Sequence, residues 1–127
     1  MNDKLDNKIK VFVVDDEEDT REYIKSHFKR RGYLMFTAGS AEEALPIIKE
    51  ENPNIMLLDV NLPKMNGVEL LKLVRQFNPT IKVILVSGSE MDSVDDSQLK
   101  GLDVLEVMRK PESFEALEVI LKKASEQ

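Results

Sequence analysis

Five short apolar runs, separated by longer segments with helical spacing, are the feature that most constrains the fold of this chain. The runs are rich in Val, Ile and Leu, and they are nearly continuous rather than alternating between apolar and polar residues. Runs of this kind are typical of strands that are covered on both faces, as in a parallel sheet. They occupy residues 9–14, 33–38, 55–58, 83–86 and 104–108.

The segments between these runs carry apolar residues three or four positions apart, which predicts amphipathic helices. We expect helices over residues 18–31, from Ser40 onwards, over 66–77 and from near Ser113, with a weaker one over 91–100. The pattern Ser40-Ala41-Glu42-Glu43 predicts a capping box at the second helix. Repetition of strand and helix predicts parallel strands joined by right-handed crossovers, and therefore a three-layer α/β sandwich.

Pro46 lies inside the predicted second helix. A proline there removes one backbone donor and clashes with the preceding turn. We therefore expect a kink at this residue, with tertiary packing offsetting the strain.

Length and composition exclude several classes of protein. The 127 residues show no internal linker, so residues 1–127 are predicted to form one domain, with 1–7 as a flexible N-terminal segment. The net charge of −6 argues against nucleic-acid binding by this chain, which requires clustered Lys and Arg. The absence of cysteine excludes disulfides and thiolate chemistry. The apolar runs are too short for a membrane span or a signal peptide, so a cytoplasmic protein is expected.

Polar residues follow four of the five predicted strands. Ligands bind beyond the carboxyl ends of the strands in a parallel α/β sheet. The residues expected there are three carboxylates, one hydroxyl and one ammonium, namely Asp15, Asp16, Asp59, Ser87 and Lys110.

This set of side chains suits phosphoryl chemistry. Clustered carboxylates repel one another and need a counter-charge, and hard oxygen ligands are those that Mg²⁺ takes. A carboxylate can attack phosphorus and form an aspartyl phosphate. The Lys110 ammonium and the Ser87 hydroxyl would then stabilise the transferring oxygens.

Each residue taken alone has a simpler explanation. Asp15 and Asp16 could cap the following helix, and Asp59 could be a turn residue. Lys110 could lie on the surface, and Ser87 alone is uninformative. The sole histidine, His27, lies mid-helix among cations, which favours a surface or packing role. The placement of polar residues at four separate strand ends favours one common site.

The chain resembles the receiver domain of two-component response regulators. The resemblance covers nearly the whole sequence and rests on four motifs: VFVVDDEEDTREYI, IMLLDVNLPKMNGVELL, VILVSGS and RKP. It implies the flavodoxin-like (βα)5 fold with a five-stranded parallel sheet in the order 2-1-3-4-5. It also implies a regulatory domain that catalyses only its own phosphorylation and dephosphorylation.

The resemblance implies a role for each site residue. Asp59 would be the phosphoacceptor, and Asp15, Asp16, Asp59 and the backbone carbonyl of Asn61 would hold Mg²⁺. Ser87 and Lys110 would contact the phosphoryl group. The donor would be a phosphohistidine on a histidine kinase or a phosphotransfer protein. A downstream partner or effector and a homodimer are left open.

The sequence departs from the family pattern near the fifth strand. Val107 occupies a position that is usually Tyr or Phe, three residues before the site lysine. Residue 112 is Glu where Phe is common, and the stretch 101–110 is about two residues longer than usual. The alternative function is therefore a receiver-like docking or dimerisation module with a weakened or absent phosphorylation switch.

Two enzyme-like alternatives have less support. A hydrolase with an aspartyl nucleophile would need a substrate pocket and a second acid–base pair, and the sequence offers neither. A flavin protein would need backbone donors rich in Ser, Thr and Gly after the first strand, and five carboxylates stand there instead.

Overall fold

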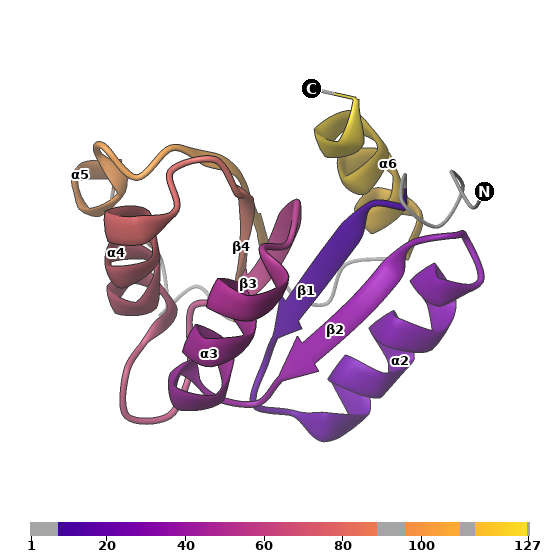
Figure 1. Ribbon diagram of the computed structural model, residues 1–127, viewed down its shortest axis with the longest axis horizontal. Coiled ribbons are helices and arrows are strands. Elements are labelled where there is room, and N and C mark those ends of the chain that lie inside the picture. Colours follow the sequence, from indigo (N-terminus) through magenta and orange to yellow (C-terminus); the bar gives the residue numbers. More distant parts are fainter. Residues whose placement is uncertain (1–7, 89–95, 110–113, 127) are drawn as a thin grey trace.

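The computed structural model describes residues 8–88, 96–109 and 114–126. Within these ranges, strands and helices alternate along the chain (Figure 1). The strands are β1 (Lys10–Val14), β2 (Leu34–Ala38), β3 (Ile55–Asp59), β4 (Lys82–Ser87) and β5 (Val104–Arg109). The helices are α2 (Glu18–Lys29), α3 (Ala41–Glu51), α4 (Gly67–Phe77), α5 (Asp96–Leu99) and α6 (Phe114–Ser125).

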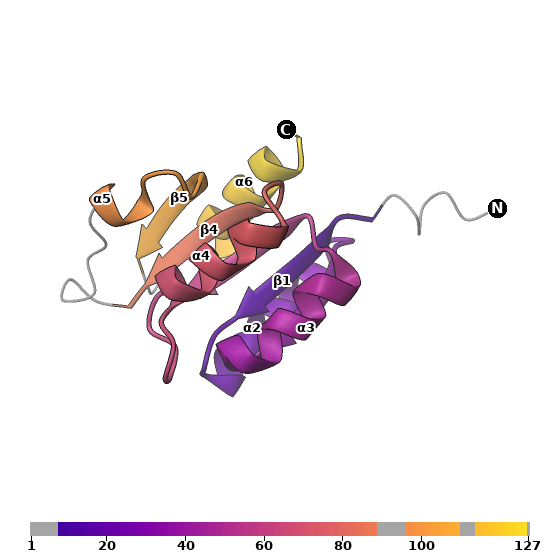
Figure 2. The same ribbon diagram turned by 60° about the vertical axis from the view of Figure 1, so that its left-hand side comes forward.

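The strands form one parallel sheet in the order β2-β1-β3-β4-β5, which confirms the predicted flavodoxin-like topology. The central strand β3 is buried along its whole length, as its continuous apolar sequence predicts. In Figure 2, α3 and α4 lie in front of the strands and α6 lies behind them. The sheet is therefore the middle layer of three.

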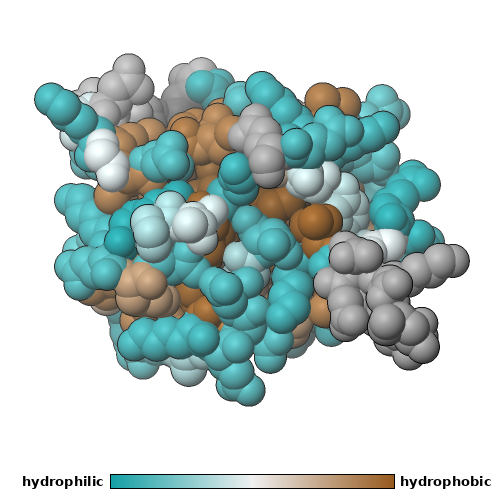
Figure 3. Space-filling model, turned by 45° about the horizontal axis from the view of Figure 1, so that its top comes forward, coloured by the Kyte–Doolittle hydropathy of each residue, from teal (hydrophilic) through white to brown (hydrophobic). Residues whose placement is uncertain are grey.

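Two apolar clusters fill the spaces on either side of the sheet. Buried residues of α3 and α4, with Leu99 of α5 partly buried, pack against one face. Buried residues of α2 and α6, among them Phe28 and Leu121, pack against the other face. On the face shown in Figure 3, hydrophilic side chains cover most of the surface, with hydrophobic residues visible between them. The apolar faces of the helices thus account for the layered core.

The start of α3 matches the predicted capping pattern in part. The Ser40 side chain accepts a hydrogen bond from the Glu43 N–H, as a capping box requires. The Glu43 carboxylate, however, accepts from the N–H of Gly39 rather than from that of Ser40. The helix continues through Pro46 to Glu51. The kink predicted at Pro46 stays a prediction.

Strand β5 contains a register shift that the apolar pattern did not predict. Val83 pairs with Val104 but the next residue, Ile84, pairs with Glu106, so Leu105 is an extra residue in β5. This β-bulge reverses the alternation of side chains beyond it. Leu105 and Met108 therefore pack against the same apolar cluster although they are three residues apart.

The connection before β5 is held by one side chain of α4. Arg75 donates hydrogen bonds to the backbone carbonyls of Leu102 (2.7 Å) and Asp103 (3.1 Å). Burial lowers the pKa of this guanidinium, which nonetheless stays charged near neutral pH. Gly101 and Asp103 both have positive φ in this turn, at 82° and 55°. Arg75 thus fixes the point at which the bulged strand enters the sheet.

Candidate functional site

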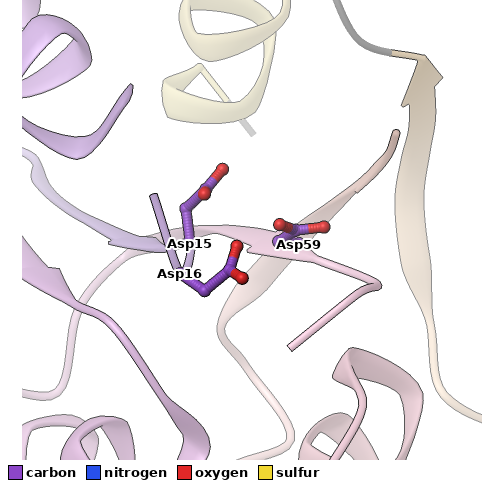
Figure 4. Close-up of side chains that lie close together, drawn as sticks. All are labelled: Asp15, Asp16 and Asp59. Atoms are coloured by element: carbon purple, nitrogen blue, oxygen red, sulfur yellow. The ribbon is translucent and has the colours of Figure 1, made fainter. Parts of the chain in front are cut away.

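Three aspartates meet at the carboxyl edge of the sheet. Val14 of β1 pairs with Leu58 of β3, so the next residue of each strand, Asp15 and Asp59, reaches the same edge. One carboxylate oxygen from each of Asp15, Asp16 and Asp59 lies within 4.8 Å of the other two. Figure 4 shows the three side chains gathered in one space at the end of β1 and β3. The structure therefore brings together the carboxylates predicted from the strand ends.

Two of the three carboxylates in this cluster are buried, so their charges are screened less by solvent than those of an acidic patch on the surface. Asp15 is 4% exposed and Asp59 is 3% exposed, whereas Asp16 is exposed to solvent. Carboxylates at this separation repel one another strongly when solvent screening is reduced. Hard oxygen donors from three carboxylates suit a divalent cation such as Mg²⁺ better than they suit a thiolate-preferring metal.

The backbone orients the two buried carboxylates. Asp15 Oδ1 accepts a hydrogen bond from the Glu17 N–H at 2.9 Å. Asp59 Oδ1 accepts one from the Asn61 N–H, also at 2.9 Å. Both bonds join a residue to the one two positions further on, in the pattern of an Asx turn. Each aspartate is thus held by the loop that follows its own strand.

The helix-cap explanation for the first two aspartates is not supported. The N-cap residue of α2 is Glu17, and its side chain makes no capping hydrogen bond. Glu18 and Asp19 are exposed in the first turn, where carboxylates suit the helix dipole. The acidic run after β1 therefore divides into two residues at the cluster and others at the start of the helix.

The loop after β3 is fixed by Gly67, the first residue of α4. The Gly67 N–H donates to the Val60 carbonyl at 2.8 Å. A Cβ atom on residue 67 would lie 2.4 Å from the Asp59 carbonyl oxygen and 3.0 Å from Val60 Cα. Only glycine allows α4 to begin this close to the backbone of Asp59.

A capping box that the sequence analysis missed anchors the same helix. The Asn66 side chain accepts from the Glu69 N–H at 2.9 Å, and the Glu69 carboxylate accepts from the Asn66 N–H at 3.1 Å. The spacing Asn-x-x-Glu before an apolar run was the available signal. This box sets where α4 begins and so supports the loop behind Asp59.

Of the other predicted site residues, the structure describes Ser87 and Asn61 but not Lys110. Ser87 ends β4, is 7% exposed and lies opposite Arg109 of β5. Asn61 is exposed in the loop after β3. Lys110 and Glu112 lie outside the described residues. Val107 is 44% exposed on β5, so its position is open to solvent.

A cavity of about 520 Å³ lies beside the aspartates. Its lining includes the carboxylate residues Asp15, Glu17 and Asp59. The rest of the lining comes mostly from apolar and aromatic side chains of the sheet, α2 and α6, such as Ile24, Met108 and Phe114. The Asp59 side chain is therefore close to the surface of a hollow, despite its low exposure.

His27 has the packing role predicted for it. Its ring stacks on Phe114 of α6, with ring centroids 4.2 Å apart and an angle of 18° between the planes. Its Nε2 lies 2.7 Å from Glu118 Oε1, and Arg31 also reaches this oxygen, at 3.1 Å. His27 thus joins α2 to α6.

Comparison with known proteins identifies the family of this chain. Residues 11–122 match the family model for the response regulator receiver domain. The chain belongs to the receiver domain family. It is a phosphoacceptor signalling domain, and the relatives do not favour the docking-only alternative.

Two relatives from Bacillus subtilis illustrate the range of proteins that contain this domain. The receiver domain is 32% identical over 115 residues to sporulation initiation phosphotransferase F, covering 90% of this chain and 91% of that protein. It is 35% identical over 98 residues to the alkaline phosphatase synthesis transcriptional regulatory protein PhoP. In that case the match covers 76% of this chain and 41% of PhoP.

Solved structures share the fold closely. A receiver domain of the Francisella response regulator 1452 has a TM-score of 0.82 and 27% identity, with 94% of this chain and 98% of that chain covered. A CheY-like receiver domain protein from Methanospirillum hungatei has a TM-score of 0.82 and 29% identity, with 94% and 95% covered.

Membership of the family has general consequences. Receiver domains are regulatory domains that interact with histidine kinases or phosphotransfer proteins, and they typically bind Mg²⁺ at an acidic pocket. The cluster of Asp15, Asp16 and Asp59 matches such a pocket in its chemistry. None of the described helices is long and apolar enough to cross a membrane.

Proposed function

We propose that Asp59 accepts a phosphoryl group from a phosphohistidine of a histidine kinase or phosphotransfer protein, in a reaction that depends on Mg²⁺. The observation that carries this proposal is the approach of Asp15, Asp16 and Asp59 to within 4.8 Å of one another at the carboxyl edge of the sheet. Asp59 comes from the central strand and lines the cavity at that edge. It therefore combines an oriented carboxylate with access from outside.

Transfer of the phosphoryl group forms one P–O bond and breaks one P–N bond. A carboxylate oxygen of Asp59 attacks phosphorus and forms the P–O bond of an aspartyl phosphate. The P–N bond to the donor histidine breaks, and its electron pair stays with the imidazole nitrogen, which takes up a proton. Hydrolysis later returns the carboxylate and releases inorganic phosphate. Self-modification of this kind makes the domain a regulator rather than a turnover enzyme.

Asp15, Asp16, Asp59 and the backbone carbonyl of Asn61 would hold the cation. Their oxygen atoms are hard ligands of the type that Mg²⁺ prefers, and the exposure of Asp16 leaves room for coordinated water. When bound, Mg²⁺ supplies positive charge that stabilises the phosphoryl oxygens during transfer. The hydrogen bonds from the Glu17 and Asn61 N–H groups keep the Asp15 and Asp59 carboxylates directed for this role.

Ser87 and Lys110 are proposed to contact the phosphoryl group. Ser87 is buried at the end of β4, next to Val86, which pairs with Asp59, and this placement supports a hydroxyl at the site. Lys110 directly follows β5, whose last residue lies opposite Ser87. An ammonium and a hydroxyl are donors that stabilise charge on a transferring phosphoryl group.

Phosphorylation by a small donor tests the proposal directly. The purified domain is incubated with acetyl phosphate and Mg²⁺, and the added phosphoryl group is located by mass spectrometry. We expect one alkali-labile phosphoryl group on Asp59, no labelling in Asp59→Asn, and no labelling after Mg²⁺ is chelated. Asp19→Asn is the matched control, because Asp19 is an exposed carboxylate at the start of α2. Labelling that persists in Asp59→Asn would contradict the assignment.

Three further features stay predictions. These are a single receiver domain over residues 1–127, a cytoplasmic location and a homodimer. The match of residues 11–122 to one family model and the single five-stranded sheet support the first of them.

A further inference from the structure

Arg21 reaches from α2 back to the backbone of the aspartate pair. Its Nη1 donates a hydrogen bond of 2.7 Å to the main-chain carbonyl of Asp15. This carbonyl belongs to the peptide group that joins Asp15 to Asp16. Arg21 is partly buried, and its backbone N–H donates to the Glu17 carbonyl at 3.1 Å. The guanidinium thus contacts the loop on which both aspartates are carried.

A glycine in the neighbouring loop makes room for this contact. A Cβ atom on Gly39 would lie 2.8 Å from Arg21 Nη1 and 3.3 Å from Arg21 Cζ. The guanidinium therefore lies close to Gly39, and a Cβ atom there would require a shift of Arg21 Nη1, with Glu43 Oε1 also close at 3.1 Å. Because residue 39 follows β2, the contact joins the loop after β2 to the loop after β1.

The loop that carries Gly39 is itself fixed. The Gly39 N–H donates to Glu43 Oε1 at 2.8 Å. The preceding residue, Ala38, accepts a hydrogen bond from the Asp15 N–H at 3.1 Å. Arg21 therefore contacts a loop whose position is set independently by α3 and by the sheet.

The two aspartates differ in how they are held. The Asp15 side chain is buried and bonded to the Glu17 N–H. Asp16 is exposed, so the conformation of its backbone contributes more to where its carboxylate lies. A charge-assisted hydrogen bond to the peptide that precedes Asp16 restricts that backbone. Arginine suits this task because its planar, permanently charged guanidinium can pack on a flat backbone surface while it donates a hydrogen bond to a carbonyl.

We infer that Arg21 is a positioning residue for the cation site: it fixes the Asp15–Asp16 peptide, with Gly39 as its support, and so sets the affinity of the cluster for Mg²⁺. This inference rests on the proposed function, because it concerns the cation that phosphoryl transfer requires. Arg21 acts through the backbone of Asp15 and need not touch the phosphoryl group. Its loss should weaken cation binding more than it slows transfer at saturating Mg²⁺.

The alternative role for Arg21 is purely structural, as a tie between α2 and the loop after β2. The two roles predict different measurements. A structural tie changes the free energy of unfolding and leaves the Mg²⁺ affinity of the folded domain unchanged. A positioning residue changes the Mg²⁺ affinity of the folded domain.

The experiment compares wild type with Arg21→Ala, Arg21→Lys, Gly39→Ala and Arg30→Ala. Arg30→Ala is the charge-matched control, because Arg30 is an exposed cation just after α2. Mg²⁺ binding is measured by amide chemical shifts in NMR titrations, and thermal unfolding is recorded for each variant. The initial rate of phosphorylation by acetyl phosphate is then measured over a range of Mg²⁺ concentrations.

For Arg21→Ala we expect the Kd for Mg²⁺ to rise about tenfold, the size of effect that loss of one charge-assisted hydrogen bond can produce. The phosphorylation rate at saturating Mg²⁺ should stay near the wild-type value. Gly39→Ala should raise the Kd in the same direction although Arg21 is still present. Arg21→Lys should fall between wild type and Arg21→Ala, and Arg30→Ala should match wild type.

The outcomes separate this inference from the proposed function. Unchanged Mg²⁺ affinity in folded Arg21→Ala and Gly39→Ala would overturn the role of Arg21, even if both proteins unfold at lower temperature. If Arg21→Ala fails to fold, Gly39→Ala and Arg21→Lys decide between the two roles. Absence of Mg²⁺ binding or phosphorylation in wild type would instead overturn the proposed function.

Discussion

Asp15 and Asp59 are held in the same way on neighbouring strands. Each is nearly completely buried at the end of its strand, and each accepts a 2.9 Å hydrogen bond from the backbone N–H two residues further on. The loops after β1 and β3 thus present two carboxylates in matching conformations. Asp16 and Asp59 differ in this respect, since only Asp59 is buried.

Substitution of Asp16 tests whether Asp16 belongs to the carboxylate cluster while Glu18 and Asp19 belong only to the start of α2. Because Asp16 belongs to the cluster, Asp16→Asn should reduce Mg²⁺-dependent phosphorylation by acetyl phosphate at least about tenfold at low Mg²⁺. Glu18→Gln and Asp19→Asn remove a charge of the same sign from the exposed start of α2 and should change the rate little. Equal losses in all three variants would show that general negative charge, rather than ligand geometry, controls the reaction.

In Gly67→Ala two physical effects on stability act in opposite directions. Helix propensity favours alanine by about 1 kcal/mol. The new Cβ atom, however, would lie 2.4 Å from the Asp59 carbonyl oxygen, where a backbone shift is required. We expect the clash to prevail and to lower the free energy of unfolding by about 1–3 kcal/mol, measured by urea denaturation. The phosphorylation rate should also fall, because the shifted backbone carries Asp59.

A control on the same helix distinguishes the clash in Gly67→Ala from a general sensitivity of α4 to substitution. Lys72→Ala changes an exposed position in the middle of this helix and should leave the stability within about 0.5 kcal/mol of wild type. A stabilised Gly67→Ala would mean that the loop after β3 relaxes without cost.

Asn66→Ala removes the N-cap of α4. Alanine removes the side-chain acceptor of the Glu69 N–H and keeps the backbone N–H that donates to Glu69, so we expect a loss of about 1 kcal/mol in the free energy of unfolding. Asn66→Ser retains a capping side chain and should recover most of the loss. Similar destabilisation by both substitutions would show that the box contributes little. Circular dichroism during urea denaturation gives the comparison.

The contact between Glu118 and His27 predicts a dependence of stability on pH. The hydrogen bond from His27 is the largest of the causes that lower the pKa of Glu118 below its ordinary value of 4.5, and the charge of Arg31 adds to it. A carboxyl whose pKa is lower in the folded state contributes stability above its unfolded pKa. That contribution is lost as the pH falls through the lowered folded-state value.

Glu118→Gln should therefore unfold more easily than wild type near neutral pH, and the difference should shrink as the pH falls below about 4.5. Thermal unfolding across this range measures the effect. Glu115→Gln, at an exposed position on the same helix, is the control and should show no comparable trend. A difference between wild type and Glu118→Gln that is constant with pH would mean that the contact acts through packing alone.

Much of the fold follows from the sequence because it depends on burial patterns. Each apolar run became a strand whose boundaries differ from the predicted ones by at most one residue: β1 begins at Lys10 rather than at residue 9, and β3 extends to Asp59. The weakly predicted fourth helix spans only Asp96–Leu99 among the described residues.

The clustering of Asp15, Asp16 and Asp59 was predictable because the topology brings strand ends to one edge. The contacts of Arg21 and Gly39 were not, since each depends on where a side chain meets a backbone distant in the sequence. The bulge at Leu105 was likewise hidden, because an apolar run does not reveal its register with a neighbouring strand. Both features arise from tertiary geometry, which local patterns do not encode.

The bulge at Leu105 divides β5 into two parts. Residues up to Val104 and residues from Glu106 onwards are out of phase by one position along the strand. Counting along β5 without a break at Leu105 would therefore assign residues on one side of the bulge to the wrong face of the sheet. Val107 lies after the bulge, on the part of the strand whose facing is set by the pairing of Ile84 with Glu106.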